Sequence, residues 1–563
     1  MNILLTAAAT PIALWLIYRI YERVLLSRAK HRSLRGHSRL SRRLAKLVLY
    51  YSFGEREFFS SDGADEAIAA RRREGFKALA ERLSAGSRAS IDATAQAALG
   101  LSDLKFTSAY RVPFQYREYA GKHLKSAGFA AETRGVRIRD LDGNWSYDLS
   151  GSYGVNLLGY EFYKRNIEKA VAVAGRLGPV LGPYHPVVGD NAERLREISG
   201  LDEVSFHMSG TEAVMQAVRL ARYRTGRSQT VVFCGAYHGW WDGVQPGIGN
   251  QRPAGDVYTL SDMSERTLKV LSSRRDIACV LVNPLQALHP NSGASSDAML
   301  IASDRRAHFD RAAYSEWLRR LRQVCSERGI VLIFDEVFVG FRLGLGGAQE
   351  YFGVQADMVT YGKTLGGGLP VGALTGRREL MQRYRDERPT DVCFARGTFN
   401  SHPYVMAAMN EFLKRAMDEA ALTAAAETVW STRRADLNAA LAAADLPVRA
   451  SNMSSVWTLI YTRPSRYNWM LQYYLRAEGL ALSWVGTGRF IFSHDYTDED
   501  FAAVKTRILN AARNMLADGW WSGSPSLSNR GIRRQVLAEM LAARLGRRHR
   551  NPAPLATAPQ TRG

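Results

Sequence analysis

Cysteine is scarce in this chain: among its 563 residues there are four, Cys234, Cys279, Cys325 and Cys393. They form no CxxC pair and no cluster with histidine at metal-ligand spacing, so we predict neither a disulfide framework nor a metal site. Widely spaced thiols in a long chain are typical of a reducing compartment. Internal repeats are missing too, and a composition with 46% hydrophobic and 23% charged residues excludes the low-complexity and collagen-like classes.

Acidic residues are nearly absent from both ends of the chain. Residues 1–50 hold ten basic residues and one acidic one, residues 525–563 hold eight and one, and the body carries only +5 of the net charge of +21. Such an excess indicates nucleic acid or anionic lipid as a partner. Neither end has a nucleic-acid-binding fingerprint, so we predict no nucleic acid and expect contact with an anionic membrane surface; plain solvation is the alternative for the C-terminal tail.

A long apolar run opens the chain. Residues 3–18 carry no charge, and as a helix they would span about 24 Å of the ~30 Å hydrocarbon core of a bilayer. The basic segment that follows should stay in the cytoplasm. We therefore predict a transmembrane or membrane-anchoring helix at 1–27 and a protein at the cytoplasmic face of the membrane. The alternatives are a helix lying in the interface of a peripheral or cytoplasmic protein, or one buried on the protein's own body or on a second subunit.

The body alternates short apolar runs with helical patterns from about residue 104 onward. That alternation is typical of a largely parallel α/β sheet, in which ligands gather at the carboxyl ends of the strands. The strand-like runs are Val204–Phe206, Thr230–Phe233, Ala278–Val282, Val331–Phe334, Met358–Tyr361 and Val371–Thr375.

Residues suited to binding a flat, phosphorylated ligand follow two of these runs. Ser209, Gly210 and Thr211 open a helix, where free backbone N–H groups, two hydroxyls and the positive end of the dipole offer a phosphate site. The same residues are also ordinary helix caps. Tyr237, in the glycine-containing segment 234–239, has a ring that can lie flat on a planar ligand.

A carboxylate and a lysine follow two further runs. Asp335 ends an apolar strand, where its burial requires a cationic partner such as a protonated ring nitrogen or, alternatively, a nearby arginine such as Arg342. Lys363 stands before a glycine-rich turn, and burial there would lower its pKa and favour the amine that forms a Schiff base. A phosphate-binding turn, an aromatic ring that can stack on a ligand, a buried carboxylate and a lysine nucleophile occur together in this order. This combination predicts a pyridoxal 5'-phosphate (PLP) site.

Four longer stretches carry a family resemblance: SGTEAVMQAVRLARYRTGR, CGAYHG, LIFDEVFVGFRLGLGGAQEYFGVQADMVTYGKTLGGGLPVGALTGRRELM and RGTFNSHP. They resemble class III aminotransferases of PLP fold type I, and most closely the glutamate-1-semialdehyde 2,1-aminomutases, from about Gly135 to Leu516. The resemblance implies an α/β fold with a large, mostly parallel seven-stranded sheet domain and a smaller α+β C-terminal domain, in a homodimer with shared active sites.

This fold divides the chain after its N-terminal helix. We expect a basic and helical connector at 28–103, the N-terminal segment of the small domain at 104–185, the large PLP-binding domain at 186–415, the C-terminal small domain at 416–524, and a basic, partly disordered tail at 525–563.

The resemblance also implies roles for the residues that match its motifs. Lys363 would be the Schiff-base lysine and proton shuttle, and Asp335 would keep the ring nitrogen protonated. Ser209, Gly210 and Thr211 would bind the phosphate, together with Thr398 of the second subunit. Val337 and Tyr237 would contact the two faces of the ring. His238 would also belong to the cofactor-binding residues, in a structural rather than a catalytic role.

The resemblance is weaker for the substrate residues. Tyr153 would line the substrate pocket, and Arg111 or Arg117 would bind a substrate carboxylate. The departures from the family pattern are Asn283-Pro284 in place of Glu-Pro, Phe338 in place of methionine, and Gly488, beside Arg489, in place of the aminomutase's pocket glutamate.

These features predict a PLP-dependent class III aminotransferase or aminomutase that transfers an amino group to a carbonyl substrate. The departures and the predicted anchor favour an acyl, lipid-linked or carrier-bound carbonyl compound. The alternatives are glutamate-1-semialdehyde 2,1-aminomutase proper, a PLP decarboxylase or epimerase on the same fold, and a membrane-tethered scaffold without turnover. A scaffold is expected to have lost Lys363 or Asp335, and the sequence retains both.

Overall fold

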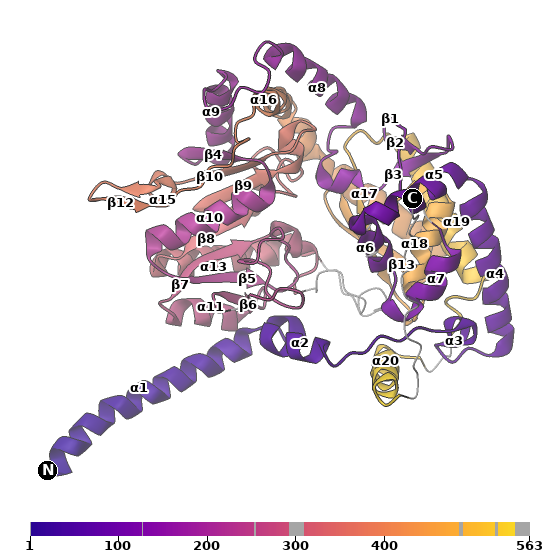
Figure 1. Ribbon diagram of the computed structural model, residues 1–563, viewed down its shortest axis with the longest axis horizontal. Coiled ribbons are helices and arrows are strands. Elements are labelled where there is room, and N and C mark those ends of the chain that lie inside the picture. The colour runs from indigo at the N-terminus through magenta and orange to yellow at the C-terminus, as the bar shows by residue number, and fades with distance from the viewer. Residues whose placement is uncertain are drawn as a thin grey trace, which may run out of the picture.

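A seven-stranded sheet forms the centre of the larger of two lobes (Figure 1). The computed structural model describes residues 2–125, 128–252, 255–291, 309–483, 488–523 and 527–546. The strand order is β4-β10-β9-β8-β7-β5-β6; strands run parallel from β9 to β6, and β10 is antiparallel to both of its neighbours. The bounds are β4 Glu203–His207, β5 Gln229–Phe233, β6 Val257–Leu260, β7 Ile277–Val282, β8 Val331–Asp335, β9 Met358–Gly362 and β10 Gly372–Gly376.

Apolar side chains cover both faces of this sheet, as parallel strands require. Val232 and Ile333 pack against α10 (Gly210–Thr225) on one face, while Val231 and Leu332 pack against α11 (Glu265–Ser273) and α13 (Arg311–Arg328) on the other. The predicted mostly parallel α/β sheet is thus confirmed, and six strands lie within one residue of the predicted runs. The sequence did not reveal β6, a short edge strand whose two central residues are only half-buried.

The remaining elements of the large lobe surround this sheet. They are η3 (Gly151–Gly154), α8 (Tyr160–Ala174), α9 (Val187–Ser199), η4 (Pro284–Leu288), α14 (Gly347–Phe352), η5 (Lys363–Gly366), α15 (Arg378–Met381), the hairpin strands β11 (Tyr384–Arg385) and β12 (Arg388–Val392), and α16 (Pro403–Asp418).

Two smaller sheets, ordered β1-β2-β3-β15 and β13-β14-β16, form the second lobe. Its hydrophobic core combines residues from the N-terminal helices, such as Phe58 and Phe76, with Trp457 and Trp520 from the C-terminal part of the chain. The bounds are α3 Glu55–Ser60, α4 Glu66–Ala85, α5 Arg88–Gly100, α6 Ser102–Tyr110, η2 Phe114–Tyr116, α7 Arg117–His123, β1 Glu132–Arg134, β2 Arg137–Arg139, β3 Trp145–Asp148, α17 Ala420–Ala443, β13 Val448–Met453, β14 Val456–Tyr461, η6 Asn468–Met470, α18 Leu471–Ala477, β15 Leu480–Ala481, β16 Arg489–Ile491 and α19 Asp498–Ala517.

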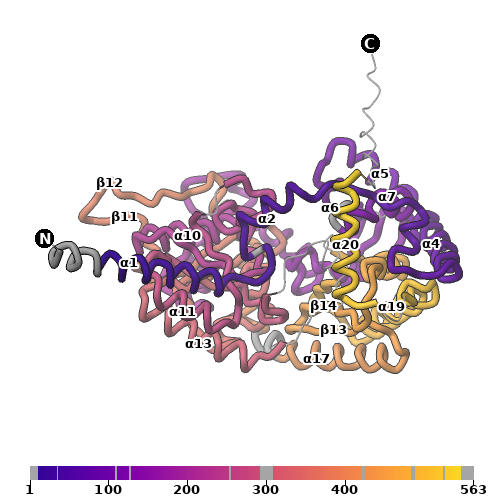
Figure 2. Tube along the Cα trace, turned by 90° about the horizontal axis from the view of Figure 1, so that it is seen from below, coloured from indigo at the N-terminus to yellow at the C-terminus, as the bar shows by residue number. Residues whose placement is uncertain are grey.

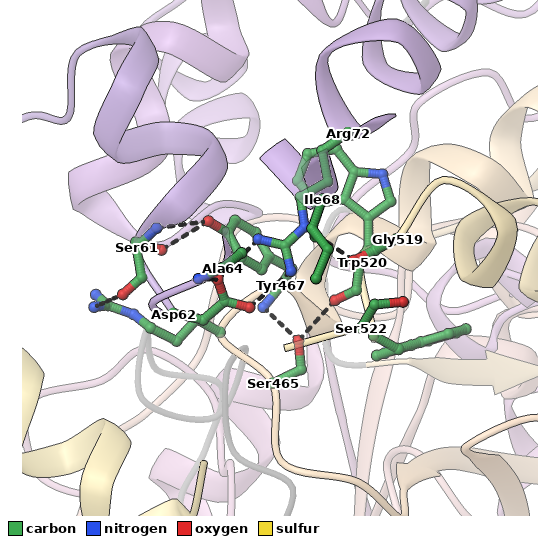
Figure 3. Close-up of polar contacts among 12 residues, drawn as sticks. Ser61, Asp62, Ala64, Ile68, Arg72, Ser465, Tyr467, Gly519, Trp520 and Ser522 are labelled. Carbon is green, nitrogen blue, oxygen red and sulfur yellow. Dashed lines mark hydrogen bonds and ion pairs between the residues drawn. The ribbon is translucent and has the colours of Figure 1, made fainter. Parts of the chain in front are cut away.

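A buried, ion-paired arginine links the N-terminal helices to the C-terminal part of this lobe (Figure 3). Arg72 and Asp62 are almost fully buried, and each carboxylate oxygen of Asp62 accepts a hydrogen bond from the guanidinium at 2.8 Å. The guanidinium also donates to the carbonyl oxygens of Phe59 and Gly519 and lies 4.6 Å from the ring centre of Tyr467. This N-terminal segment is therefore part of the small-lobe core.

The C-terminal helix α20 (Asn529–Arg544) also contacts the small lobe. Its Glu539 pairs with the buried Arg466 at 2.6 Å and accepts a hydrogen bond from the hydroxyl of Tyr51 at 3.0 Å. This helix occupies part of the basic tail predicted at 525–563. Residues 547–563, on which the prediction of disorder fell, lie outside the described residues.

The first helix, α1 (Asn2–Ala29), lies along α11 and leads into η1 (Leu34–Gly36) and α2 (Ser38–Ala45) (Figures 1 and 2). Its last turns pack on the large lobe through Leu25, Leu26 and Ala29, while Trp15 and Ile17 are exposed.

Over the part of the chain that the structure describes, no helix is long and apolar enough to cross a membrane. By this criterion the predicted anchor at 1–27, and the membrane localisation that depended on it, are wrong. Charged residues enter α1 from Arg19 onward, and the helix buries one of them, Glu22, against the protein body.

Candidate active site

A cavity of about 600 Å³ opens at the carboxyl ends of the sheet strands. It collects eight of the predicted residues, because the carboxyl ends of neighbouring parallel strands lie side by side at one edge of the sheet. These are Ser209, Gly210, Thr211, Tyr237, His238, Asp335, Val337 and Lys363.

The amino end of α10 forms one wall of the cavity. Ser209 caps this helix, since its Oγ accepts a hydrogen bond from the N–H of Glu212 at 3.3 Å. The N–H groups of Gly210 and Thr211 belong to the first turn, which has no intrahelical acceptors and carries the positive end of the dipole. Gly210 also allows close packing, because a Cβ there would lie 2.5 Å from Cγ1 of Val337. This wall can therefore hold an anion such as a phosphate.

Asp335 presents a buried carboxylate to the cavity at the end of β8. Its Oδ2 lies 2.7 Å from Nδ1 of His238, and its Oδ1 accepts hydrogen bonds from Thr360 Oγ1 at 3.2 Å and from the N–H of Val337 at 3.3 Å. Arg342, the alternative partner, instead donates to three backbone carbonyl oxygens and a serine hydroxyl. The carboxylate is thus fixed in position without an arginine and faces the cavity.

Lys363 follows β9 with a φ of 51°, a left-handed conformation that is strained for a residue other than glycine. Its Nζ lies 5.2 Å from the ring centre of Phe338. Burial lowers the pKa of Lys363; the charge of Asp335 opposes this shift, and Arg342 adds to it. The neutral, nucleophilic amine is therefore populated at lower pH than in a free lysine.

The segment with Tyr237 is held by Asn283, the residue that departs from the family's Glu-Pro. Nδ2 of Asn283 donates to the carbonyl oxygen of Tyr237 at 2.9 Å, and Oδ1 accepts from the N–H of Leu285 at 3.2 Å. The Tyr237 ring stays exposed within the cavity lining, so it is available to a planar ligand.

Four predicted residues do not line this cavity. Thr398 is exposed on the segment after β12, and Nε of Arg117 donates to the carbonyl oxygen of Val112 at 2.8 Å. Tyr153 lies in η3, and Arg111, whose pKa burial lowers, interacts electrostatically with it.

Arg489 and His289 are among the cavity residues that sequence reasoning did not assign to the site. Nη2 of Arg489 lies 3.0 Å from Nε2 of His289. No acidic side chain among the described residues forms an ion pair with Arg489, and burial lowers its pKa to about 10. The one signal in the sequence was an arginine inside the otherwise uncharged run GRFIF at 488–492.

The cavity fits PLP by the chemistry of its walls. The amino end of α10 suits a phosphate, the carboxylate of Asp335 a protonated ring nitrogen, and the amine of Lys363 an aldehyde carbon. With the seven-stranded sheet, these groups define a PLP enzyme of fold type I.

Comparisons with known proteins identify the family. The sequence model of the family aminotransferase class-III matches residues 119–501, and the chain belongs to that family. Glutamate-1-semialdehyde 2,1-aminomutase from Nitratidesulfovibrio vulgaris (strain DP4) is 33% identical over 405 residues, which cover 69% of this chain and 91% of the relative.

Solved structures agree on the fold. An omega-transaminase from Sphaerobacter thermophilus superposes with a TM-score of 0.59 at 26% identity, covering 69% of this chain and 91% of its own. A glutamate-1-semialdehyde-aminomutase from Pseudomonas aeruginosa PAO1 reaches a TM-score of 0.64 at 19% identity, covering 79% and 99%. The chain is accordingly a PLP-dependent aminotransferase or aminomutase.

Proposed function

We propose that this enzyme is an aminotransferase whose carbonyl substrate carries a carboxylate or a similar anion, bound by Arg489. The supporting observation is a partly buried guanidinium that lines the cofactor cavity and has a histidine, and no described acidic residue, as its side-chain partner. A guanidinium that faces a cavity can bind a substrate carboxylate through two parallel hydrogen bonds.

Each group of residues around the cavity would have its own role in amino transfer. PLP supplies an aldehyde that condenses with amines and a ring that takes up the electron pair of a broken C–H bond. Lys363 would hold the cofactor covalently at rest and then carry a proton between the substrate carbon and the cofactor carbon. Asp335, fixed by His238, would keep the ring nitrogen protonated, and Ser209, Gly210 and Thr211 would bind the phosphate.

Class III aminotransferases are typically homodimers, and we propose the same assembly here. Thr398 would then reach the phosphate site of the second subunit, a role supported by its exposed position away from its own cavity. Tyr153 would border the substrate at the domain junction, since Gly154 beside it faces Lys363: a Cβ at Gly154 would lie 3.1 Å from the lysine Cδ.

The substrate proposal differs from the one favoured by the sequence. A carrier-bound or acyl substrate remains compatible with it if it carries an anion close to the reacting carbonyl. The amino shift named for the 33% identical relative is the second candidate. The two differ in stoichiometry: an aminotransferase converts a separate amino donor to a carbonyl compound, whereas an aminomutase moves the amino group within one molecule.

A half-reaction screen tests the proposal. The holoenzyme is mixed with single amines, and the loss of the visible absorbance of lysine-bound PLP is followed while the carbonyl product is measured by mass spectrometry. We expect conversion by amines that carry a carboxylate. A protein that binds no PLP, or a PLP-loaded protein that converts no carboxylate-bearing amine, would contradict it.

A further inference from the structure

The segment that packs against Lys363 has a strained backbone. Ser152 and Tyr153 adopt positive φ angles of 45° and 57°, which residues with a Cβ rarely occupy. The next residue, Gly154, packs so closely that a Cβ there would lie 2.9 Å from the ring of Phe338 and 3.1 Å from Cδ of Lys363. A strained segment persists only when its surroundings over-determine its conformation. The contacts that hold this segment therefore belong to the site.

Arg342 supplies these contacts at the carboxyl end of the segment. Its Nη2 donates hydrogen bonds to the carbonyl oxygens of Gly154 and Asn156 at 3.2 and 3.1 Å. Its Nη1 donates to Oγ of Ser455 and to the carbonyl oxygen of Phe492, both at 2.9 Å. The side chain is fully buried, and it ties the segment to two parts of the small lobe.

Asp148 holds the other end of the segment from the end of β3. Its Oδ1 accepts hydrogen bonds from the N–H groups of Ser150 and Gly151 at 2.9 and 3.2 Å. Its Oδ2 accepts a hydrogen bond from the hydroxyl of Tyr160 at 2.7 Å. The backbone of the segment is thus held by a buried carboxyl group at one end and by the buried guanidinium of Arg342 at the other.

We propose that Arg342 is a positioning residue for amino transfer, which holds residues 151–156 against Lys363 and fixes the small lobe to them. A guanidinium offers five N–H donors in one rigid plane, so it can serve four acceptors from three parts of the chain, whereas a lysine has three donors and no such plane. The same segment carries Tyr153, so its position also sets the shape of the substrate pocket. This inference rests on the proposed role of Lys363 and holds for either candidate reaction.

The positive charge of Arg342 also acts on Lys363. Burial lowers the pKa of Arg342 to about 10, so the guanidinium stays charged at neutral pH. Burial lowers the pKa of Lys363 too; Asp335 opposes that shift and Arg342 adds to it. Loss of the cation, or entry of water after the segment loosens, would therefore raise the pKa of Lys363. The titratable groups that interact electrostatically with the guanidinium are Tyr163, Asp148, His494 and Lys363.

The test compares Arg342→Gln and Arg342→Lys with the wild-type protein. Arg227→Gln is the matched control, because Arg227 also donates to carbonyl oxygens, but near the amino ends of β7 and β8, away from the cavity. Its acceptors are the carbonyl oxygens of Ile277, Arg328 and Gly329. Hydrogen exchange of the PLP-loaded protein is followed by mass spectrometry. We expect exchange in peptides that cover 151–156 to accelerate about ten-fold or more in both Arg342 variants and to stay unchanged in the control.

A second readout reports on Lys363 itself and needs neither substrate nor turnover. The PLP-free full-length protein is acetylated over a range of pH, and modified Lys363 is measured by peptide mass spectrometry. The midpoint of the pH profile should rise by about 1 pH unit in Arg342→Gln, by less in Arg342→Lys, which keeps the charge, and not at all in Arg227→Gln.

The outcomes separate this inference from the proposed function. An unchanged midpoint in Arg342→Gln, or unchanged exchange at 151–156, overturns the positioning role. Faster exchange throughout both lobes overturns it as well, because it indicates a general loss of stability. If Arg342→Gln does not fold, the exchange of Arg342→Lys decides the question. A wild-type protein that binds no PLP refutes the proposed function, while acetylation of Lys363 still tests Arg342.

Discussion

Replacing Arg72 with methionine should strongly destabilise the small lobe. The substitution keeps an apolar stem of similar reach but removes the guanidinium that donates two hydrogen bonds to Asp62 and one each to the carbonyl oxygens of Phe59 and Gly519. Asp62, with 2% of its surface exposed, would keep a buried carboxylate without a cation. Breaking a buried pair in this way costs about 3–5 kcal/mol, a large share of the ~5–15 kcal/mol by which most proteins are stable.

The measurement is urea unfolding followed by far-ultraviolet circular dichroism. Arg72→Met should shift the first unfolding transition to clearly lower urea. The double variant Arg72→Met/Asp62→Leu removes both charges and should regain most of the loss, because buried pairs are often replaceable by apolar residues. Arg73→Met, which removes the neighbouring exposed arginine paired with Glu66, is the matched control and should leave the transition unchanged.

Two results would refute this reasoning. If Arg72→Met unfolds at the wild-type urea concentration, the pair does not stabilise the lobe. If the double variant is as unstable as the sum of both single variants, the two side chains act independently and the buried charge is not the cause.

Two further predictions concern the site, and a third concerns Glu336, a buried carboxyl next to Asp335 in the chain. Lys363→Ala should lose the visible absorbance of lysine-bound PLP together with amino transfer, as measured by spectroscopy and product analysis; retained absorbance would assign the cofactor to another lysine. Gly210→Ala should weaken PLP binding at least ten-fold in equilibrium dialysis, because its Cβ would lie 2.5 Å from Cγ1 of Val337 and displace the phosphate seat. Burial raises the pKa of Glu336 from 4.5 to about 8. The unfolded chain releases this proton at lower pH than the folded one, so the free energy of unfolding should fall as the pH rises from 4.5 to about 8, and Glu336→Gln should flatten that slope.

The sequence predicted the sheet, and it predicted candidate cofactor residues that the fold brings to one cavity, because both depend on local patterns. Each core strand is a short apolar run, and Thr211, Tyr237, Asp335 and Lys363 follow such runs within a few residues. Since the carboxyl ends of neighbouring parallel strands share one edge, the order of runs along the chain was enough to bring these side chains together.

The same local approach gave the wrong answer for the N-terminal helix. An uncharged stretch of this length suggests a helix that inserts into a membrane. Its hydropathy does not reveal that the turns after it pack on the protein's own large lobe. In the structure the carbonyl oxygen of Ala29, at the end of α1, accepts a hydrogen bond from the N–H of Ser261. Leu25 and Leu26, in the last turns of the helix, pack on the large lobe.

The sequence by itself therefore determined the class of cofactor and the groups that we propose to bind it, because strand propensity, helix capping and turn chemistry act over a few residues. The tertiary structure alone decided which distant groups surround the charged side chains. Arg72 finds Asp62 and the carbonyl of Gly519, whereas Arg489 meets His289, 200 residues away, and no described acid. Gly519 lies 447 residues from Arg72 and His289 lies 200 residues from Arg489, so these contacts form only when distant parts of the chain fold together.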